Sequence, residues 1–445
     1  MTFQEFKNCI MTRCDELGVA EYELYYQTAE STSVSAFQQE INQFSASLEG
    51  GVCFRCIRDG KMGYASTEQL SRESALRLVE RAMDNAAGLE AEEPVFLCEG
   101  GKTYTQLPVF QVTIPGTDAL VSKVLQTQKL LYGADPAVID GCTTQGVAER
   151  SEIAIFNSRG LDLHDETTLV GLVVAAVVSD GTEMANDYQI ELGSLETIDA
   201  EALTKKAAQE ALNKLGGEPA PTGKYPVVFD PEAMSDLLST FSGIFSAENA
   251  RKGLSRLAGK EGETVASAVV TLVDDPAYPG SFLQRSFDAE GSPAFRKSVI
   301  EAGKLGTLLY DLKNAALAGK ETTGNASKAS YDSPVGIRPF TLYLAAGDTT
   351  EEALLNRAGN GVYINSLGGL HAGANPVSGD FSLQSAGYLI ENGKKTAHVK
   401  SFTVAGNFYD LLKNIVCVAD DLKFPGMGTV GSPSVLVEGL SIAGK

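Results

Sequence analysis

The sequence predicts an α+β protein with a small N-terminal α/β unit, a middle α/β unit and a larger, mostly β C-terminal domain. First, its 445 residues exceed what one ordinary hydrophobic core can hold. Second, polar segments with Gly and Pro at 91–110 and 216–226 indicate linkers. These linkers leave units at 1–90, 111–215 and 227–445. Third, short apolar stretches separated by glycine dominate the last unit, which is typical of strands.

The N-terminal unit begins with a helix expected over residues 3–17, where apolar side chains recur at helical spacing. The next strands and helix are expected over residues 21–30, 33–46, 50–67 and 73–89. Asp59-Gly60 is typical of a tight hairpin turn, so the segment 50–67 should fold back on itself. Thr67 or Ser71 is the expected N-cap of the helix.

The middle unit should hold a helix over 116–133, several strands between 138 and 191, and a helix near 198–215. In the C-terminal domain we expect one helix near 231–245 and another near 350–358, with strands elsewhere. Asn392-Gly393, directly after an apolar run, predicts a second tight hairpin turn.

Charge and composition narrow the possible functions. The chain has 36 basic and 57 acidic residues, a net charge of -21, which argues against nucleic acid as the main partner. The longest apolar run, residues 169–178, is too short to span a bilayer, so no membrane partner is expected. Seven scattered cysteines and the lack of a signal-peptide pattern favour a reducing, cytoplasmic setting.

Cys53 and Cys56 form a C-x-x-C pair, a spacing found in many metal and redox sites. Both lie in an expected strand, where residues three apart point to opposite faces. The two thiols then cannot converge on one ion, and we interpret them as structural.

The chain has only three histidines: His164, His371 and His398. No two of them stand at the spacing that puts a pair of imidazoles on one helical face, as a zinc peptidase helix requires. We therefore expect no metal site and no cofactor in this chain.

Candidates for covalent or acid–base catalysis are few. Ser382 and Cys417 are the nucleophiles that can be named, but a nucleophile needs a nearby base. Cys417 ends an apolar run and fits a buried position better. Asp288 and Glu290 could form a carboxylate pair, although beside Gly291 and a proline they fit turn and capping roles better.

Segments 286–328 and 368–415, taken in order, resemble the TldD/PmbA (TldE) family, once labelled modulators of DNA gyrase and now regarded as peptide-processing proteins. The hairpin at 50–67 and the segment 432–445 are similar to the family as well. The resemblance covers nearly the whole chain.

The family has two branches. In the TldD branch an H-E-x-x-x-H helix and a cysteine near the C-terminus bind zinc, whereas the PmbA/TldE branch lacks these ligands and pairs with a TldD chain. The corresponding helix here, 230–248, contains no histidine, and the segment 420–433 contains no cysteine. The resemblance is therefore to the PmbA/TldE branch, and zinc is expected in the partner chain.

The resemblance and the turn chemistry of glycine, asparagine and aspartate together nominate residues of a peptide groove or of family motifs. Those in the second half of the C-terminal domain are His371, Asn375, Gly379, Asp380, Phe381, Ser382, Glu391, Asn392, Gly393, Gly406 and Asn407. Those in the first half are Asp288, Glu290, Gly291 and Asn325. No catalytic residue and no metal ligand is expected among them.

The resulting hypothesis is a non-catalytic subunit of a cytosolic metallopeptidase that processes or degrades small or unfolded peptides, which could bind in extended form along a strand edge. Its partner would be a TldD-like chain carrying H-E-x-x-x-H. Two alternatives stay open: a self-sufficient hydrolase, with metal held by His371 or acidic groups, and a stand-alone homodimeric peptide-binding protein.

Overall fold

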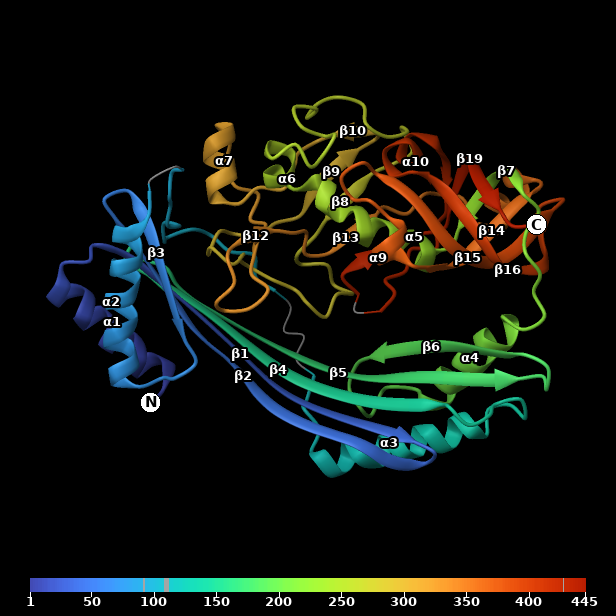
Figure 1. Ribbon diagram of the computed structural model, residues 1–445, viewed down its shortest axis with the longest axis horizontal. Helices are drawn as coiled ribbons and strands as arrows, with labels where there is room; N and C mark the ends of the chain where they lie inside the picture. The colour runs from blue at the N-terminus through green and yellow to red at the C-terminus, as the bar shows by residue number, and fades with distance from the viewer. Residues whose placement is uncertain (91–92, 108–111, 427) are drawn as a thin grey trace.

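The computed structural model describes residues 1–90, 93–107, 112–426 and 428–445. A six-stranded antiparallel sheet, in the order β3-β2-β1-β4-β5-β6, spans the first half of the chain (Figure 1). Its strands are β1 (Glu21–Phe37), β2 (Glu40–Arg58), β3 (Lys61–Thr67), β4 (Thr143–Asn157), β5 (Asp162–Ser179) and β6 (Met184–Leu192).

The strands β1 and β2 are longer than the sequence pattern indicated. The expected strand over 33–46 is wrong, because the chain turns at Gln38 and Gln39, which have φ angles of 51° and 64°. This left-handed turn carries none of the glycine or asparagine signals that usually mark it. The hairpin at Asp59 and Gly60 is confirmed, with φ angles of 51° and 74°.

Four helices pack on this sheet, two at each end. The helices α1 (Phe3–Leu17) and α2 (Arg72–Gly88) build one apolar core with β1 and β2. The helices α3 (Thr117–Tyr132) and α4 (Ala200–Asn213) build a separate core with β1, β4 and β5. All four were predicted, and Ser71 is confirmed as the N-cap of α2.

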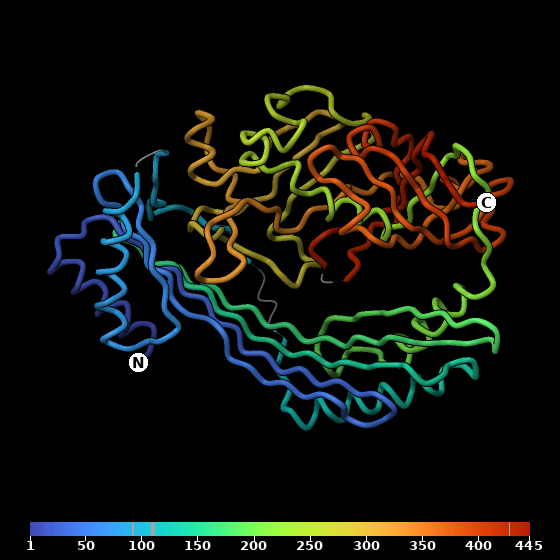
Figure 2. Tube along the Cα trace, in the orientation of Figure 1, coloured from blue at the N-terminus to red at the C-terminus, as the bar shows by residue number. Residues whose placement is uncertain are grey.

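The two expected α/β units therefore share a single sheet while each keeps its own core. The tube in Figure 2 shows the β1–β2 hairpin running beside β4 and β5 along the whole length of this sheet. The boundaries expected at 90 and 111 stay predictions, and residues 91–92 and 108–111 of that linker lie outside the described part of the chain.

The C-terminal domain is rich in sheet. One sheet has the order β16-β15-β14-β7-β19-β17, and a further pairing of β16 with β19 closes five of its strands into a ring. Its strands are β7 (Gly223–Phe229), β14 (Gly361–Gly368), β15 (Asp380–Glu391), β16 (Lys394–Asn407), β17 (Ile415–Val418) and β19 (Val435–Ala443).

A second sheet of this domain has the order β10-β9-β8-β13-β18. Its strands are β8 (Leu272–Asp274), β9 (Lys297–Glu301), β10 (Lys304–Leu305), β13 (Leu342–Leu344) and β18 (Val430–Gly431). A two-stranded pair, β11 (Ala326–Ser327) with β12 (Gly336–Ile337), stands beside it. The predicted fold class, with a mostly β C-terminal domain, is confirmed.

Two helices expected in this domain are present, α5 (Pro231–Phe241) and α8 (Glu351–Ala358). The end of the helix expected near 231–245 is a 3₁₀ turn, Ser242–Phe245, and the sequence pattern missed four short helices, which are α6 (Ala247–Arg251), α7 (Leu312–Ala318), α9 (Leu370–Gly373) and α10 (Phe408–Asn414). None exceeds seven residues, too few for an apolar period to show. Across the described residues, no helix has the length and apolar character needed to cross a bilayer.

Candidate functional site

The helix α5 occupies the position at which the resemblance implies a zinc-binding helix. It starts directly after β7, and the Asp230 side chain caps it by accepting a hydrogen bond of 2.8 Å from the Ala233 amide. Fully buried side chains fill its interior face, and these are Ala233, Met234, Leu237, Leu238 and Phe241. Burial raises the pKa of Asp230 to about 7.

These residues do not fit a zinc ion bound in the H-E-x-x-x-H manner. Such a site needs two imidazoles on one face of the helix, and α5 offers carbon side chains and a thioether there. Its polar side chains nearest to that role are Glu232 and Asp236, two carboxylates one turn apart whose pKa values burial raises. Zinc ligation by a pair of imidazoles therefore has no basis in α5.

The three histidines lie in different parts of the fold. His164 is on β5, where it contacts Glu152 at 2.8 Å, and His371 is exposed on α9. His398 is on β16, with its ring 5.4 Å from that of Tyr388. Within the described ranges, no group of three or more His, Cys, Asp or Glu side chains is arranged to hold a metal ion.

The loop between α9 and β15 is built by asparagine. The Asn375 side chain accepts hydrogen bonds from the amides of Val377 and Ser378, at 3.0 and 3.1 Å. The Asn407 side chain donates to Asp380 at 2.7 Å and to the Ser378 carbonyl at 2.9 Å. The hydrogen bond from Asn407 lowers the pKa of Asp380. These predicted residues therefore do come together, in an exposed loop held by side-chain hydrogen bonds.

Gly379 and Gly406 allow close packing around this Asn375 loop. Gly379 has a φ of +81°, and a Cβ there would lie 2.5 Å from Tyr409. A Cβ at Gly406 would lie 2.9 Å from the ring of Phe381, which is 4% exposed. Their small size is a packing requirement.

Three other predicted residues form the hairpin turn between β15 and β16. Asn392 and Gly393 have φ angles of 51° and 75°, as this turn requires, and Glu391 ends β15. The Gly393 amide donates to the Gly359 carbonyl at 2.8 Å. This turn contacts α8 and its C-terminal cap.

Asp288 and Glu290 belong to a buried network between the N-terminal sheet and the C-terminal domain, here called the junction network. Arg55 of β2 lies 2.7 Å from Glu23 of β1 and 3.8 Å from Glu290. The Asn157 side chain also donates to Glu23, at 3.3 Å. All five residues are at most 6% exposed.

Burial raises the pKa of both Asp288 and Glu290, to about 6 and about 8. Asp288 accepts three backbone hydrogen bonds, from Glu290, Ser292 and Ala326. Gly291, with a φ of +80°, completes this turn. The prediction that the two carboxylates serve a turn fits these contacts, and Glu290 also meets Arg55 of the N-terminal sheet.

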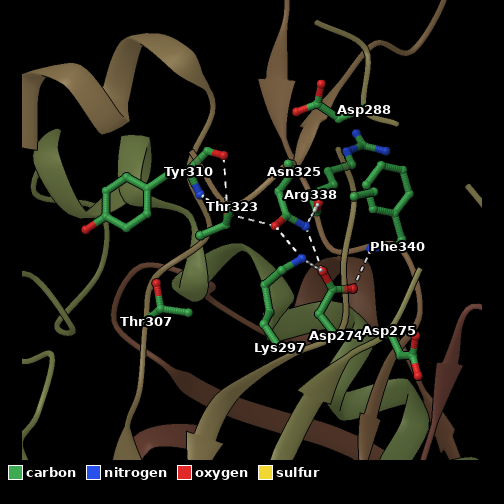
Figure 3. Close-up of polar contacts among 12 residues, drawn as sticks. Asp274, Asp275, Asp288, Lys297, Thr307, Tyr310, Thr323, Asn325, Arg338 and Phe340 are labelled. Atoms are coloured by element: carbon green, nitrogen blue, oxygen red, sulfur yellow. Dashed lines mark hydrogen bonds and ion pairs between the residues drawn. The ribbon is translucent and has the colours of Figure 1, made fainter. Parts of the chain in front are cut away.

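Asn325 lies in a third cluster, the one in Figure 3. Asp274 of β8, which is fully buried, accepts hydrogen bonds from Lys297 at 3.1 Å, Asn325 at 2.7 Å and the Phe340 amide at 2.8 Å. Asn325 also accepts one from Thr323 at 2.8 Å. The side chains satisfy one another, so this cluster ties β8 and β9 to the loops at 325 and 340.

Among the residues that the structure describes, no hydrogen bond joins Ser382 or Cys417 to a side chain that could act as a base. Ser382 is exposed on β15, opposite Ala405 of β16. Cys417 is 6% exposed and packs in an apolar cluster with Tyr363. Cys53 and Cys56 pack in two different cores, one on each face of β2, as the strand geometry predicted.

The inner face of the N-terminal sheet, meaning the face opposite α3, looks toward the C-terminal domain (Figure 1). Across the strands it presents Ser35, Gln145, Val173 and Ile190 in one row. Tyr188 of β6 is 63% exposed on this face. Partial burial and the nearby carboxylates Glu232 and Asp236 of α5 raise the pKa of Tyr188.

Sequence reasoning missed the charged residues that join the N-terminal sheet to the C-terminal domain and those that join β8 to β9. Arg55 and Glu23 stand in strands with apolar neighbours, and a charged residue inside such a pattern was the available signal. Lys297 and Asp274 had a similar signal, but their pairing depends on β8 meeting β9.

Three family models match the chain in order. The PmbA/TldA metallopeptidase domain 1 matches residues 22–86, the central domain matches 113–215, and the C-terminal domain matches 222–444. Together they cover most of the described chain.

Individual proteins agree with these matches. A protein named metalloprotease from Methanothermobacter thermautotrophicus is 29% identical, with 91% of this chain and 88% of that protein covered. Two crystal structures share the fold. One, from Thermotoga maritima and named for modulation of a DNA gyrase, has a TM-score of 0.90 at 32% identity, covering 99% and 100% of the two chains. TldE from Thermococcus kodakarensis has a TM-score of 0.87 at 27% identity, covering 98% and 99%.

Proposed function

Because this chain belongs to the PmbA/TldD metallopeptidase family, we propose that it acts in peptide processing as a non-catalytic subunit. A homologous chain with an H-E-x-x-x-H helix would supply the zinc and the bond cleavage, and the two would work together in the cytoplasm. The substrates are small or unfolded peptides.

The observation that carries this proposal is the interior of α5. In a zinc peptidase this helix would have to turn imidazoles toward a metal with an open coordination position. The interior face of α5 instead carries five fully buried apolar side chains, including Met234 and Phe241. This packing supports a role for α5 in the core of the domain.

The contribution of this chain would be to hold the peptide. The inner face carries apolar side chains such as Val173 and Ile190, beside the exposed ring of Tyr188 on the edge strand β6. An extended peptide can pair with a free strand edge through its backbone and place alternate side chains on such a face. The carboxylates Glu232 and Asp236 of α5, whose charges act on Tyr188, favour peptides with basic groups.

Mixing experiments test this proposal. The purified chain, the H-E-x-x-x-H chain from the same genome and a fluorescent unfolded peptide are combined in pairs and together. We expect cleavage only when both chains are present, with loss on chelation or when the glutamate of the partner motif becomes glutamine. If the partner alone cleaves equally well and no complex elutes, the subunit role is wrong. Zinc-dependent cleavage by the lone chain would identify it as a peptidase.

A matched pair of variants tests the inner face. Tyr188→Ser should raise the KM for the peptide at least threefold in the mixed system, because it removes an exposed ring from the proposed peptide surface. Leu317→Ser on α7, which removes a side chain 43% exposed in another part of the molecule, should leave KM unchanged. Equal KM values for the two variants would contradict this peptide surface.

A further inference from the structure

A long part of the outer edge of β2 has no neighbouring strand. β3 pairs with β2 only over Val52–Arg58, which leaves residues 40–51 open on that side among the residues that the structure describes. At about 3.3 Å per residue the open stretch is roughly 40 Å long. Figure 1 shows β2 as the outermost of the long strands. Every second residue of this stretch turns its backbone N–H and C=O outward.

The open edge also carries exposed apolar side chains. Ile41, Phe44 and Leu48 are 37%, 52% and 75% exposed. They stand opposite Ala36, Val34 and Glu30 of β1, so they share the sheet face on which α3 covers Val34 and Ala36. The apolar surface under α3 thus continues past the helix and reaches the open edge.

Among the residues that the structure describes, this edge lacks several of the usual protections of an edge strand. Natural edges carry lysine, proline or covering loops, which prevent uncontrolled pairing. Residues 40–51 contain no lysine, arginine or proline, and their only charges are Glu40 and Glu49. A stretch of this length and composition therefore matches a surface that a partner covers.

We propose that this open edge of β2 is the docking surface for the H-E-x-x-x-H chain of the proposed complex, which would add its own edge strand here. The inference rests on the proposed function and names the surface it uses. The outward backbone groups require a strand as partner, the apolar row requires apolar side chains on it, and Glu40 and Glu49 favour cationic residues opposite them.

The position of the apolar row and the charge of the chain favour the H-E-x-x-x-H chain over two other occupants, the peptide substrate and a second copy of this chain. The apolar row lies on the α3 side of the sheet, away from the inner face proposed for the peptide (Figure 1). A second copy of the chain fits poorly, because antiparallel self-pairing around Phe44 and Ser45 would place Glu40 opposite Glu49. Like charges directly opposite are destabilising, and each copy also carries a net charge of -21.

The test uses two edge strands of the same protein. Lysine is introduced at an exposed apolar position on each edge, as Leu48→Lys on β2 and Met184→Lys on β6, where Met184 is 69% exposed. A double variant, Phe44→Lys with Leu48→Lys, strengthens the first change. Binding to the H-E-x-x-x-H chain is measured by biolayer interferometry and the oligomeric state by mass photometry. Because the altered side chains are exposed, unchanged circular dichroism and Tm are expected.

We expect the double variant to weaken association at least 100-fold and Met184→Lys to change it less than threefold. A complex that forms equally well with the double variant overturns the assignment of this edge and leaves the proposed function standing. Failure of the unaltered chain to bind the partner at all overturns both. A homodimer of the lone chain that the double variant abolishes would show that a second copy covers the edge, which also overturns the assignment.

Discussion

Replacing Lys297 by alanine should severely destabilise the C-terminal domain. Lys297 is 7% exposed, and its ammonium group lies 3.1 Å from Asp274 and 3.1 Å from Asn325 in the cluster of Figure 3. Burial lowers the pKa of Lys297 and the charge of Asp274 opposes this. Without the ammonium, a carboxylate with no solvent exposure keeps only the hydrogen bonds from Asn325 and the Phe340 amide.

The magnitude follows from that geometry. Removing one partner of a buried, hydrogen-bonded ion pair costs about 3–5 kcal/mol, because the remaining charge stays desolvated. Removing both charges, as in Lys297→Met with Asp274→Asn, should cost less than Lys297→Ala alone. An exposed pair gives the matched control. Lys205 and Glu201 of α4 are 2.6 Å apart, with both side chains 63% exposed, and Lys205→Ala should cost at most about 0.5 kcal/mol.

Urea unfolding followed by far-UV circular dichroism measures these differences, since the chain has no tryptophan. With a slope of about 2–3 kcal/mol per molar urea, the Lys297→Ala midpoint should fall by about 1–2 M. A midpoint for Lys297→Ala within the range of Lys205→Ala would refute the reasoning. It would mean that water or a rearranged side chain reaches Asp274 at little cost.

Three further predictions concern a glycine, a carboxyl group and the thiols. Gly379→Ala should lower stability by about 1–3 kcal/mol in thermal unfolding, since the new Cβ meets Tyr409, whereas Gly369→Ala, at a φ of +75° in open space, should cost about 1 kcal/mol. Burial raises the pKa of Glu290 to about 8, so its contribution to stability is full below pH 4.5 and is lost as pH rises to 8. Glu290→Gln should therefore reduce the fall in Tm between pH 5 and pH 8, and an unchanged fall would contradict this. Of seven free thiols only Cys9 is not buried, so one equivalent should react fast with an aromatic disulfide in the native protein, and more than one would contradict the packing.

Local chemistry in the sequence predicts local structure well here. The helix over 3–17 follows from an apolar period, and the left-handed turns at Asp59 and Asn392 follow from their asparagine or aspartate followed by glycine. The turn at Gln38 was missed because glutamine carries no such preference. There, the pairing of β1 with β2 over their full lengths sets the turn.

Only part of the candidate site could be predicted from the sequence, because only some of its contacts are local. The Asn375 loop assembles from residues close in sequence or on paired strands, so its turn chemistry was visible. The junction network joins Glu23 and Arg55 to Glu290, more than 200 residues away. Such a contact depends on how the sheet meets the C-terminal domain, and no local pattern encodes it.

The position of β19 has a consequence for synthesis on the ribosome. This strand pairs with β7, β16 and β17, so it completes a ring whose first strand was made about 200 residues earlier. While residues 223–418 emerge, β7 and β16 each lack a neighbour, and a nascent domain in this condition exposes apolar edges. The C-terminal domain should therefore acquire protease resistance only after residue 443 has left the exit tunnel, and chaperones have a long interval in which to bind it.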